Sequence, residues 1–262
     1  MSIFKNKNTL NVIIFMACLI LVGTTFVAWQ RYQTQKNYEA LADIRAKQDK
    51  NTSDAPLANI EEDMPTTDEA TSKINQYTYK PNENTKWLAI NPDYFGWIKI
   101  AGTNIDYPFV RSDDNIDYLT LDFNGNYSDA GTLFMDYRNL GNFNDQHAII
   151  YGHYMKNKTL FHNLTLYHDK AYYEKNQIIE IAGLYETKIY KIFSVYEISA
   201  DDYAFTLDFD DESAYQNYLD TLVKQSLHAS DLEIDVANKL LSLVTCSYGV
   251  GNGRTIVHAI EQ

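Results

Sequence analysis

Eight short runs rich in β-branched and aromatic residues, separated by turn residues, constrain the fold of this chain more than any other feature. Such runs are typical of β-strands. The runs are GWIKI (96–100), NIDYPFV (104–110), TLFMD (132–136), HAIIYG (147–152), QIIEIAGL (177–184), TKIYKIFSVYEI (187–198), LLSLVTC (240–246) and RTIVHAI (254–260). Many short strands with spacers favour a barrel or a sandwich. The predicted fold class is therefore mostly β.

Helices are predicted beside these strands. An amphipathic helix is expected at 211–227, where apolar side chains recur at a period of about 3.6 after Asp and Ser residues suited to capping. Its apolar residues are Tyr215, Tyr218, Leu219, Leu222 and Leu227. Shorter helical pieces are expected at 84–91 and 159–167. The long helix is expected to flank the sheet.

Residues 10–29 form an uncharged apolar run of 20 residues. A helix of this length spans roughly 30 Å of hydrocarbon, so we predict a transmembrane anchor that follows a cytoplasmic tail of residues 1–9. A cleaved signal peptide is the alternative, but the run is longer than a usual signal core and no small-x-small cleavage site stands out. Basic residues lie on both sides of the run, so the orientation rests on the short tail and the signal-like start.

Residues 30–72 are predicted to be an extracytoplasmic stalk and linker. Their first part is rich in Gln, Lys, Ala and Glu, and residues 51–72 combine acidic and small polar residues with two prolines. Such a composition does not bury enough apolar surface to fold. We therefore place the folded domain at 73–262, outside a single-pass cell membrane.

The charge of the chain excludes one class of partner. Its formal net charge is −13 and its pI is about 4.8, and no stretch concentrates Lys and Arg, so nucleic acid is not an expected ligand. The acidic stretch LDFNGNYSD (121–129) lacks the spacing of an EF-hand, and its Asn-Gly pair marks a turn more simply. No metal site is predicted.

Cys246 has no partner for an intrachain disulfide in the exported domain, because the second cysteine, Cys18, lies in the apolar run. An odd cysteine outside the cell indicates intermolecular pairing or a reactive thiol, and a buried structural cysteine is the remaining alternative. A thiol with an ordinary pKa near 8.5 is only a few per cent thiolate at neutral pH. A catalytic cysteine therefore needs a base or a cation nearby.

Two histidines are candidates for that base. His153 closes the run HAIIYGH, where a strand ends at the rim and its side chain is accessible, so we favour it. His258 lies four residues, or roughly 13 Å, along the last strand from Arg254 and is predicted to be a core residue. The four others, which lie at strand edges or in polar stretches, are interpreted as solvated: His147, His162, His168 and His228.

Arg254 completes the candidate catalytic set. If the last two strands pair across SYGVGNG (247–253), Cys246 and Arg254 face each other at the open end of the pair. A guanidinium keeps its charge at any working pH, so it can stabilise an oxyanion without a proton transfer. A surface arginine in an ion pair is the alternative.

In these residues and in three longer stretches, the sequence resembles the class B sortases, cysteine transpeptidases of Gram-positive cell surfaces. SLVTC followed by Arg254 is similar to the TLxTC motif of that family and its downstream arginine. Three other stretches resemble class B segments: YGHYMKNKTLFHNL (151–164), GTLFMDYRN (131–139) and GWIKIAGTNIDYPFVRSDDNIDYL (96–119). The resemblance covers about residues 85–262 and implies an eight-stranded sortase barrel with flanking helices.

The resemblance also implies a reaction. The Cys246 thiolate would attack the carbonyl of a Thr in a C-terminal sorting signal, His153 would protonate the departing amine, and Arg254 would bind the carbonyl or oxyanion. A peptidoglycan amine would then release the acyl-enzyme. The implied partners are the sorting signal of secreted surface proteins and the peptidoglycan precursor, and no cofactor is required.

Motif matching also implies four substrate contacts, and each has a structural alternative. Asn115 is also suited to capping a short helix, Leu119 and Tyr151 to the core, and Thr245 to a strand. Val244 stands where some class B enzymes have Ser, so a hydroxyl contact is absent there. The identity of the sorting motif is left open.

Two other functions fit the same residues. A pilin-polymerising sortase would use a lysine of another protein as the acceptor. A membrane-tethered binding module with an inactive site would have a Cys246 that fails to react with electrophiles at neutral pH.

Overall fold

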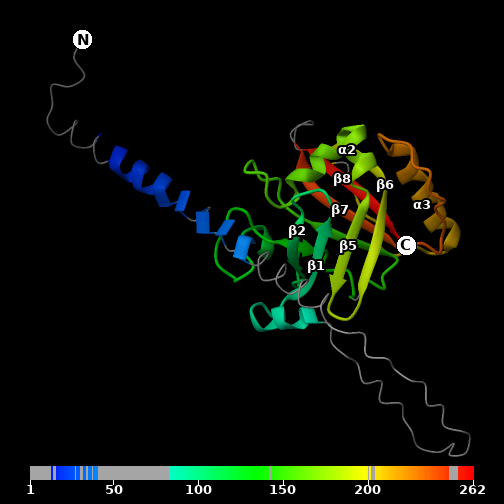
Figure 1. Cartoon of the computed structure of the whole chain (residues 1–262), viewed down its shortest axis with the longest axis horizontal. Coiled ribbons are helices and arrows are strands. Elements are labelled where there is room, and N and C mark those ends of the chain that lie inside the picture. Colours follow the sequence, from blue (N-terminus) through cyan, green and yellow to red (C-terminus); the bar gives the residue numbers. More distant parts are fainter. Residues whose placement is uncertain are drawn as a thin grey trace, which may run out of the picture.

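The computed structural model describes residue 13 and residues 16–26, 28–29, 32–33, 35–36, 38–40, 83–141, 143–199, 201, 204–247 and 253–262. Cys246 and Ser247 are described through their backbone alone. From residue 83 onward, the described chain forms a closed β-barrel with helices on its outside (Figure 1). The prediction of a mostly β fold is confirmed.

Each strand of the barrel overlaps one of the predicted runs. The strands are β1 (Tyr94–Ile100), β2 (Asp106–Val110), β3 (Leu133–Met135), β4 (His147–Tyr151), β5 (Ile178–Gly183), β6 (Thr187–Ser199), β7 (Leu240–Ser247) and β8 (Gly253–Glu261). Their order around the barrel is β1-β2-β3-β4-β7-β8-β6-β5, and β5 pairs with β1 to close it. The β2–β3 and β4–β7 pairs are parallel, and the other pairs are antiparallel.

Two apolar clusters hold the barrel together, one inside it and one against its outer face. Side chains such as Phe109, Leu133 and Val257 fill the interior. The outer cluster includes Ile149 and Val244, which pack with residues of α3 (Glu212–Gln225). β4 is therefore buried on both faces, which explains why it reads as a continuous apolar run rather than an alternating one.

The helix predicted at 211–227 is α3. Asp211 caps its N-terminus, where the side chain accepts a hydrogen bond from the Ala214 amide at 2.8 Å. Tyr215, Leu219 and Leu222 are buried as expected. The prediction that Leu227 belongs to the apolar face of this helix is wrong, because the helix ends before it and the side chain is 56% exposed.

The shorter helical pieces are tighter than an α-helix. The predictions at 84–91 and 159–167 correspond to the 3₁₀ helices η1 (Glu83–Ala89) and η3 (Phe161–His168). η2 (Asp117–Leu119) and α2 (Lys170–Lys175) were not predicted. A helix of so few residues leaves little periodicity to detect in a sequence.

Among the residues that the structure describes, no helix is both long enough and apolar enough to cross a membrane. Part of the anchor predicted at 10–29 lies outside the described residues, and the anchor stays a prediction. The tail of residues 1–9, most of the stalk and the boundary near residue 73 also lie outside them. One stalk residue, Tyr38, is buried against the barrel, where its hydroxyl donates to the Gly131 carbonyl at 2.6 Å.

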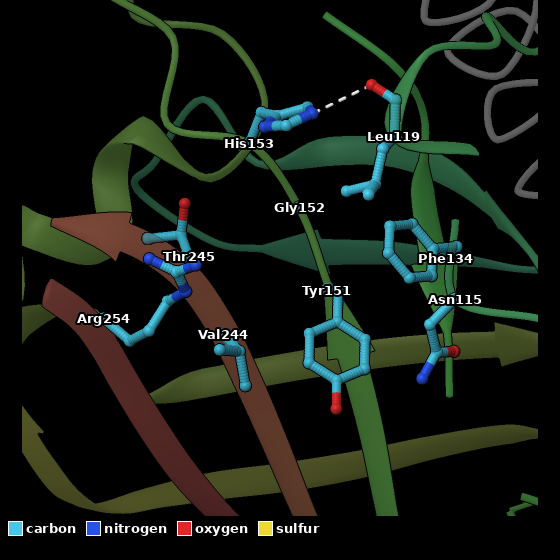
Figure 2. A pocket seen from close by; sticks show the side chains of 9 residues that line it. All are labelled: Asn115, Leu119, Phe134, Tyr151, Gly152, His153, Val244, Thr245 and Arg254. Carbon is cyan, nitrogen blue, oxygen red and sulfur yellow. Dashed lines mark hydrogen bonds between the residues drawn. The ribbon is translucent and has the colours of Figure 1, made fainter. Parts of the chain in front are cut away.

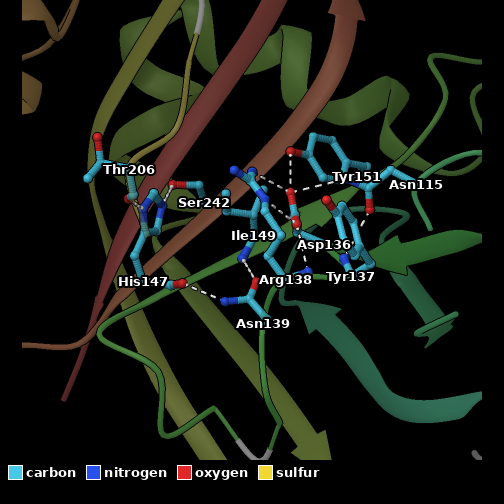
Figure 3. Close-up of polar contacts among 10 residues, drawn as sticks. All are labelled: Asn115, Asp136, Tyr137, Arg138, Asn139, His147, Ile149, Tyr151, Thr206 and Ser242. Carbon is cyan, nitrogen blue, oxygen red and sulfur yellow. Dashed lines mark hydrogen bonds and ion pairs between the residues drawn. The ribbon is translucent and has the colours of Figure 1, made fainter. Parts of the chain in front are cut away.

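A hydrogen-bonded chain of polar side chains lies beneath α3. His147 joins the Thr206 carbonyl at 2.7 Å through Nδ1 and the Ser242 hydroxyl at 2.7 Å through Nε2 (Figure 3). Ser242 continues to His258 Nδ1 at 2.6 Å, and His258 Nε2 meets the Tyr196 hydroxyl at 3.1 Å. The prediction of a core His258 is confirmed. The prediction of a solvated His147 is wrong, because α3 and the segment that precedes it cover the start of β4.

Candidate active site

A pocket of about 230 Å³ opens where the ends of β4 and β7 meet the start of β8. Nine residues line it (Figure 2): Asn115, Leu119, Phe134, Tyr151, Gly152, His153, Val244, Thr245 and Arg254. The structure therefore brings six of the seven predicted site residues to one cavity. The seventh is Cys246, whose side chain lies outside the described atoms.

The backbone register of three strands determines what meets at this pocket. Tyr151 of β4 pairs with Val244 of β7, and the Gly152 amide donates to the Val244 carbonyl at 3.1 Å. On the other side of β7, Cys246 pairs directly with Arg254 of β8. The predicted opposition of Cys246 and Arg254 is confirmed. Because β4 and β7 are parallel, the residues that follow β4 emerge at the same edge as the end of β7.

His153 stands two residues beyond β4, at the pocket rim. Its Nε2 lies 2.9 Å from the Leu119 carbonyl (Figure 2). A carbonyl only accepts, so Nε2 carries the proton of this hydrogen bond. The bond orients the imidazole and ties it to the segment that carries Leu119 on the opposite wall.

Gly152 allows the chain to pass from Tyr151 to His153 across a packed interior. A Cβ at this position would come within 2.7 Å of the Phe161 ring and would collide with Leu133 as well. A larger residue would have to displace the Leu133 and Phe161 side chains or the backbone between Tyr151 and His153. The glycine thus places Tyr151 and His153 side by side along the pocket.

Asn115 and Tyr151 are held by one buried carboxylate, which the sequence analysis did not assign. Asp136, directly after β3, has a fully buried side chain. Its Oδ2 accepts from the Tyr151 hydroxyl at 2.9 Å and from Asn115 Nδ2 at 3.2 Å. Arg138 forms an ion pair with the same oxygen at 2.8 Å. The only sequence feature that pointed to a role for Asp136 was its position as an acidic residue at the end of an apolar strand.

Asp136 is ionised in this environment. Burial favours its neutral form, but hydrogen bonds from the Arg138 side chain and backbone and from Tyr151 hold the pKa of the carboxyl below its usual range. The Arg138 side chain is 44% exposed, so the ion pair is buried at the carboxylate and reaches solvent at the guanidinium.

The remaining walls combine apolar surface with one hydroxyl. Phe134, a lining residue that was not predicted from the sequence, stacks on Tyr151 with ring centroids 5.3 Å apart. Thr245 is buried, and its Oγ1 has no hydrogen-bond partner among the described residues. An unsatisfied buried hydroxyl costs about 1–3 kcal/mol, and a ligand in the pocket would remove that cost. The cavity is therefore suited to an extended chain with apolar side chains and polar backbone groups.

Comparison with known proteins agrees with this geometry. The model of the sortase domain family matches residues 98–262, which include every residue of the site. Sortase B of Staphylococcus aureus is 36% identical over 173 residues, which cover 65% of this chain and 70% of that protein. The chain belongs to the sortase family. It is a class B sortase, a cysteine transpeptidase.

Solved sortase structures share the fold of this sortase. The X-ray structure of Clostridium perfringens sortase B has a TM-score of 0.66 and 32% identity, and the match covers 69% of this chain and 100% of that one. A substrate complex of S. aureus sortase B has a TM-score of 0.64 and 34% identity, covering 68% and 83%. The eight-stranded sortase barrel implied by the resemblance is confirmed.

Proposed function

We propose that this sortase cleaves a C-terminal sorting signal after a Thr and transfers the acylated surface protein to an amine of the cell-wall peptidoglycan. The observation that carries the proposal is the strand register: Cys246 pairs with Arg254, and Arg254 shares its pocket with His153. Three separate parts of the chain contribute, as expected of a nucleophile, a proton donor and an anion-stabilising cation. A relative with the same fold, S. aureus sortase B, has been solved as a substrate complex, which supports a substrate-binding role for this fold.

In the first half-reaction, the Cys246 thiolate attacks the Thr carbonyl carbon, and a C–S bond forms. The negative charge that develops on the carbonyl oxygen is stabilised by the guanidinium of Arg254. The C–N bond after the Thr then breaks, and the departing nitrogen takes a proton from the imidazolium of His153. The products are a thioester on Cys246 and a released C-terminal peptide.

In the second half-reaction, an amine attacks the thioester and loses a proton to the now neutral His153. The C–S bond breaks, an amide forms, and Cys246 returns to its thiolate. Covalent catalysis thus divides one difficult transfer into two easier steps. The residues supply all of this acid-base and nucleophilic chemistry, and no cofactor enters the proposal.

The substrate contacts belong to the same proposal. Asn115, Leu119, Tyr151 and Thr245 would hold the sorting signal, with Thr245 supplying its unsatisfied hydroxyl. The apolar anchor proposed at 10–29 would place the domain outside the membrane, above a stalk at 30–72. Both substrates, the exported protein and the wall precursor, are available at that surface.

The first prediction concerns the nucleophile. Cys246→Ala removes the sulfur that forms the thioester, so it abolishes the acyl adduct while the protein stays folded, because Ala preserves the strand backbone. The measurement is mass spectrometry of the protein after incubation with a library of octapeptides that each carry one central Thr. Cys18→Ala serves as the matched control and is expected to keep the adduct.

The outcome against the proposal is specific. An adduct that persists in Cys246→Ala, or a wild-type protein that forms none with any peptide and does not react with iodoacetamide at neutral pH, would overturn it. Competition between triglycine and Nα-acetyl-lysine amide for the acyl group then identifies the acceptor. Preference for the lysine side chain would assign the pilin-joining variant instead of wall transfer.

A further inference from the structure

Asp136 lies behind the pocket wall and contacts two of the lining side chains at one atom. Its Oδ2 meets the Tyr151 hydroxyl and the Asn115 amide nitrogen, while its Oδ1 accepts from the Arg138 amide at 3.0 Å and from Arg138 Nε at 2.9 Å (Figure 3). Asp136 itself is not among the residues that line the cavity. Whatever it does for the reaction, it does through its neighbours.

The charge of Asp136 defines the direction of these hydrogen bonds. An ionised carboxylate only accepts, so the Tyr151 hydroxyl and the Asn115 amide must both donate to it. On its other side, Asn115 Oδ1 accepts from the Tyr137 backbone amide at 3.0 Å. The two contacts agree on one orientation of the Asn115 amide, and rotating the amide by half a turn would break both.

This orientation has a chemical consequence for the pocket. With its oxygen held by Tyr137 and one hydrogen given to Asp136, Asn115 retains a second amide hydrogen on a nitrogen of the pocket wall. Asn115 therefore meets a ligand as a hydrogen-bond donor. Its natural partner is a backbone carbonyl of an extended peptide.

We propose that Asp136 is a positioning residue, whose buried carboxylate holds Asn115 as a donor and fixes the Tyr151 ring for the incoming sorting peptide. The inference rests on the proposed function and deepens it. The ion pair with Arg138 keeps the carboxylate charged inside the protein. Asp136 holds the Tyr151 hydroxyl, and Phe134 stacks on the Tyr151 ring and restrains it.

The test is Asp136→Asn, which keeps the shape of the side chain and removes its charge. A neutral amide does not accept from all of these donors, so Asn115 and Tyr151 lose their common partner. For the octapeptide most reactive with the wild type, we expect KM to rise about tenfold, the loss of roughly one charge-assisted hydrogen bond. The rate of Cys246 alkylation by iodoacetamide is expected to stay within about twofold of the wild-type rate. Asp136 contacts Asn115 and Tyr151, which are proposed to bind the peptide, and not the proposed nucleophile.

A merely structural role predicts something else. If Asp136 only stabilises the fold, Asp136→Asn lowers the melting temperature and reduces peptide acylation and thiol alkylation together. Asp145→Asn is the matched control, since the Asp145 carboxylate also accepts hydrogen bonds, from the Leu140 and Gly141 amides in the β3–β4 connection, but these partners do not line the pocket. It is expected to leave KM unchanged.

Coupling gives a second readout. If Asp136 acts through Asn115, Asp136→Asn adds little to KM in an Asn115→Ala background, whereas independent effects would multiply. Should Asp136→Asn fail to fold, the pair Asn115→Ala and Tyr151→Phe answers the same question. Both residues meet Asp136 Oδ2, so their effects on KM are expected to be non-additive.

The outcomes separate this inference from the function on which it rests. Wild-type acylation with an unchanged KM in Asp136→Asn, or multiplicative effects in the cycle, overturns the positioning role and leaves the proposed function intact. A wild type that forms no acyl adduct overturns both, because a substrate-positioning residue needs a substrate.

Discussion

Arg254 and Cys246 are opposed residues of an antiparallel strand pair. The proposed attack by the thiolate and the stabilisation of the oxyanion both depend on this pairing. Opposed residues lie about 4.5–5.5 Å apart at Cα and present their side chains on the same face of the sheet. A guanidinium that lines the pocket therefore stands on the face where the thiolate would react. The pairing ties cation and nucleophile together through backbone hydrogen bonds rather than through a flexible loop.

Arg254→Gln tests this relation. Glutamine retains a donor but loses the positive charge that stabilises the oxyanion, so kcat is expected to fall by about 10² to 10³, or about 2.7–4 kcal/mol of transition-state stabilisation. KM should change little, because the charge is needed mainly when the oxyanion forms. Steady-state cleavage of the octapeptide measures both constants. A rise in KM with an unchanged kcat would assign Arg254 to ground-state binding instead.

At the scale of elements, the site depends on the parallel pairing of β4 with β7. Parallel neighbours end at the same edge, so His153 emerges beside Thr245 even though the two are far apart in the sequence. β8 runs antiparallel to β7, so Arg254 at its start lies beside the end of β7 and joins the same site. α3 contributes indirectly, since it covers the outer face of these central strands and keeps them in place.

Loss of the α3 cap is expected to weaken this cover without changing the site. Asp211→Ala removes the hydrogen bond to the Ala214 amide and should lower the free energy of unfolding by about 1 kcal/mol. Urea unfolding at neutral pH measures the change. Asp210→Ala, one residue before the cap, is the control and should have a much smaller effect. Equal losses in the two variants would show that the charge of this segment matters rather than the cap.

At the scale of the whole molecule, the barrel contains a neutral polar chain that acid would disrupt. Nδ1 of His147 donates to the Thr206 carbonyl, so its Nε2 accepts from Ser242. Ser242 then accepts from His258 Nδ1, and Tyr196 donates to His258 Nε2. Burial lowers the pKa of His147 to about 4, and burial together with the neighbouring His147 lowers the pKa of His258 well below its usual value. Both imidazoles are therefore neutral in the folded protein.

These pKa values predict a loss of stability between about pH 6.5 and pH 4. In that window His147 is protonated in the unfolded chain, where its pKa is near the ordinary 6.5, but stays neutral in the folded protein. The unfolded state therefore binds more protons, and the free energy of unfolding falls as the pH falls. The loss from His147 reaches about 3 kcal/mol at pH 4, from a pKa difference of about 2.5. Above pH 7 both states are neutral at this group and the contribution vanishes.

Urea unfolding at several pH values between 7.5 and 4.5 measures this slope. His147→Gln keeps hydrogen-bonding atoms but does not titrate, so its stability should depend less steeply on pH than that of the wild type. A slope that does not change in His147→Gln would contradict the assignment.

The strands and the helix α3 were predictable from the sequence because their periodicity and composition are local signals. Cys246, His153 and Arg254 could be proposed as catalytic residues from the sequence, because their residue types limit the possible chemistry. The burial of His147 was not predictable, because the start of β4 is covered by a helix that lies far along the chain. Neither the pocket-lining Phe134 nor the buried Asp136 behind the wall could be assigned from the sequence, because their importance arises from contacts with Tyr151 and Asn115 in other segments.

By itself, the sequence determined the mostly β class, the eight strand segments, the capped helix and the kinds of chemical groups available for catalysis. Only the tertiary structure decided the strand order, the parallel pairing of β4 with β7, and the convergence of side chains on one cavity. Strand formation depends on neighbouring residues, whereas pairing across long separations depends on how all the apolar faces are buried together. The orientation of Asn115 by a buried carboxylate was likewise decided by the tertiary structure. Its hydrogen bonds exist only once β3, β4 and the η2 segment have packed together.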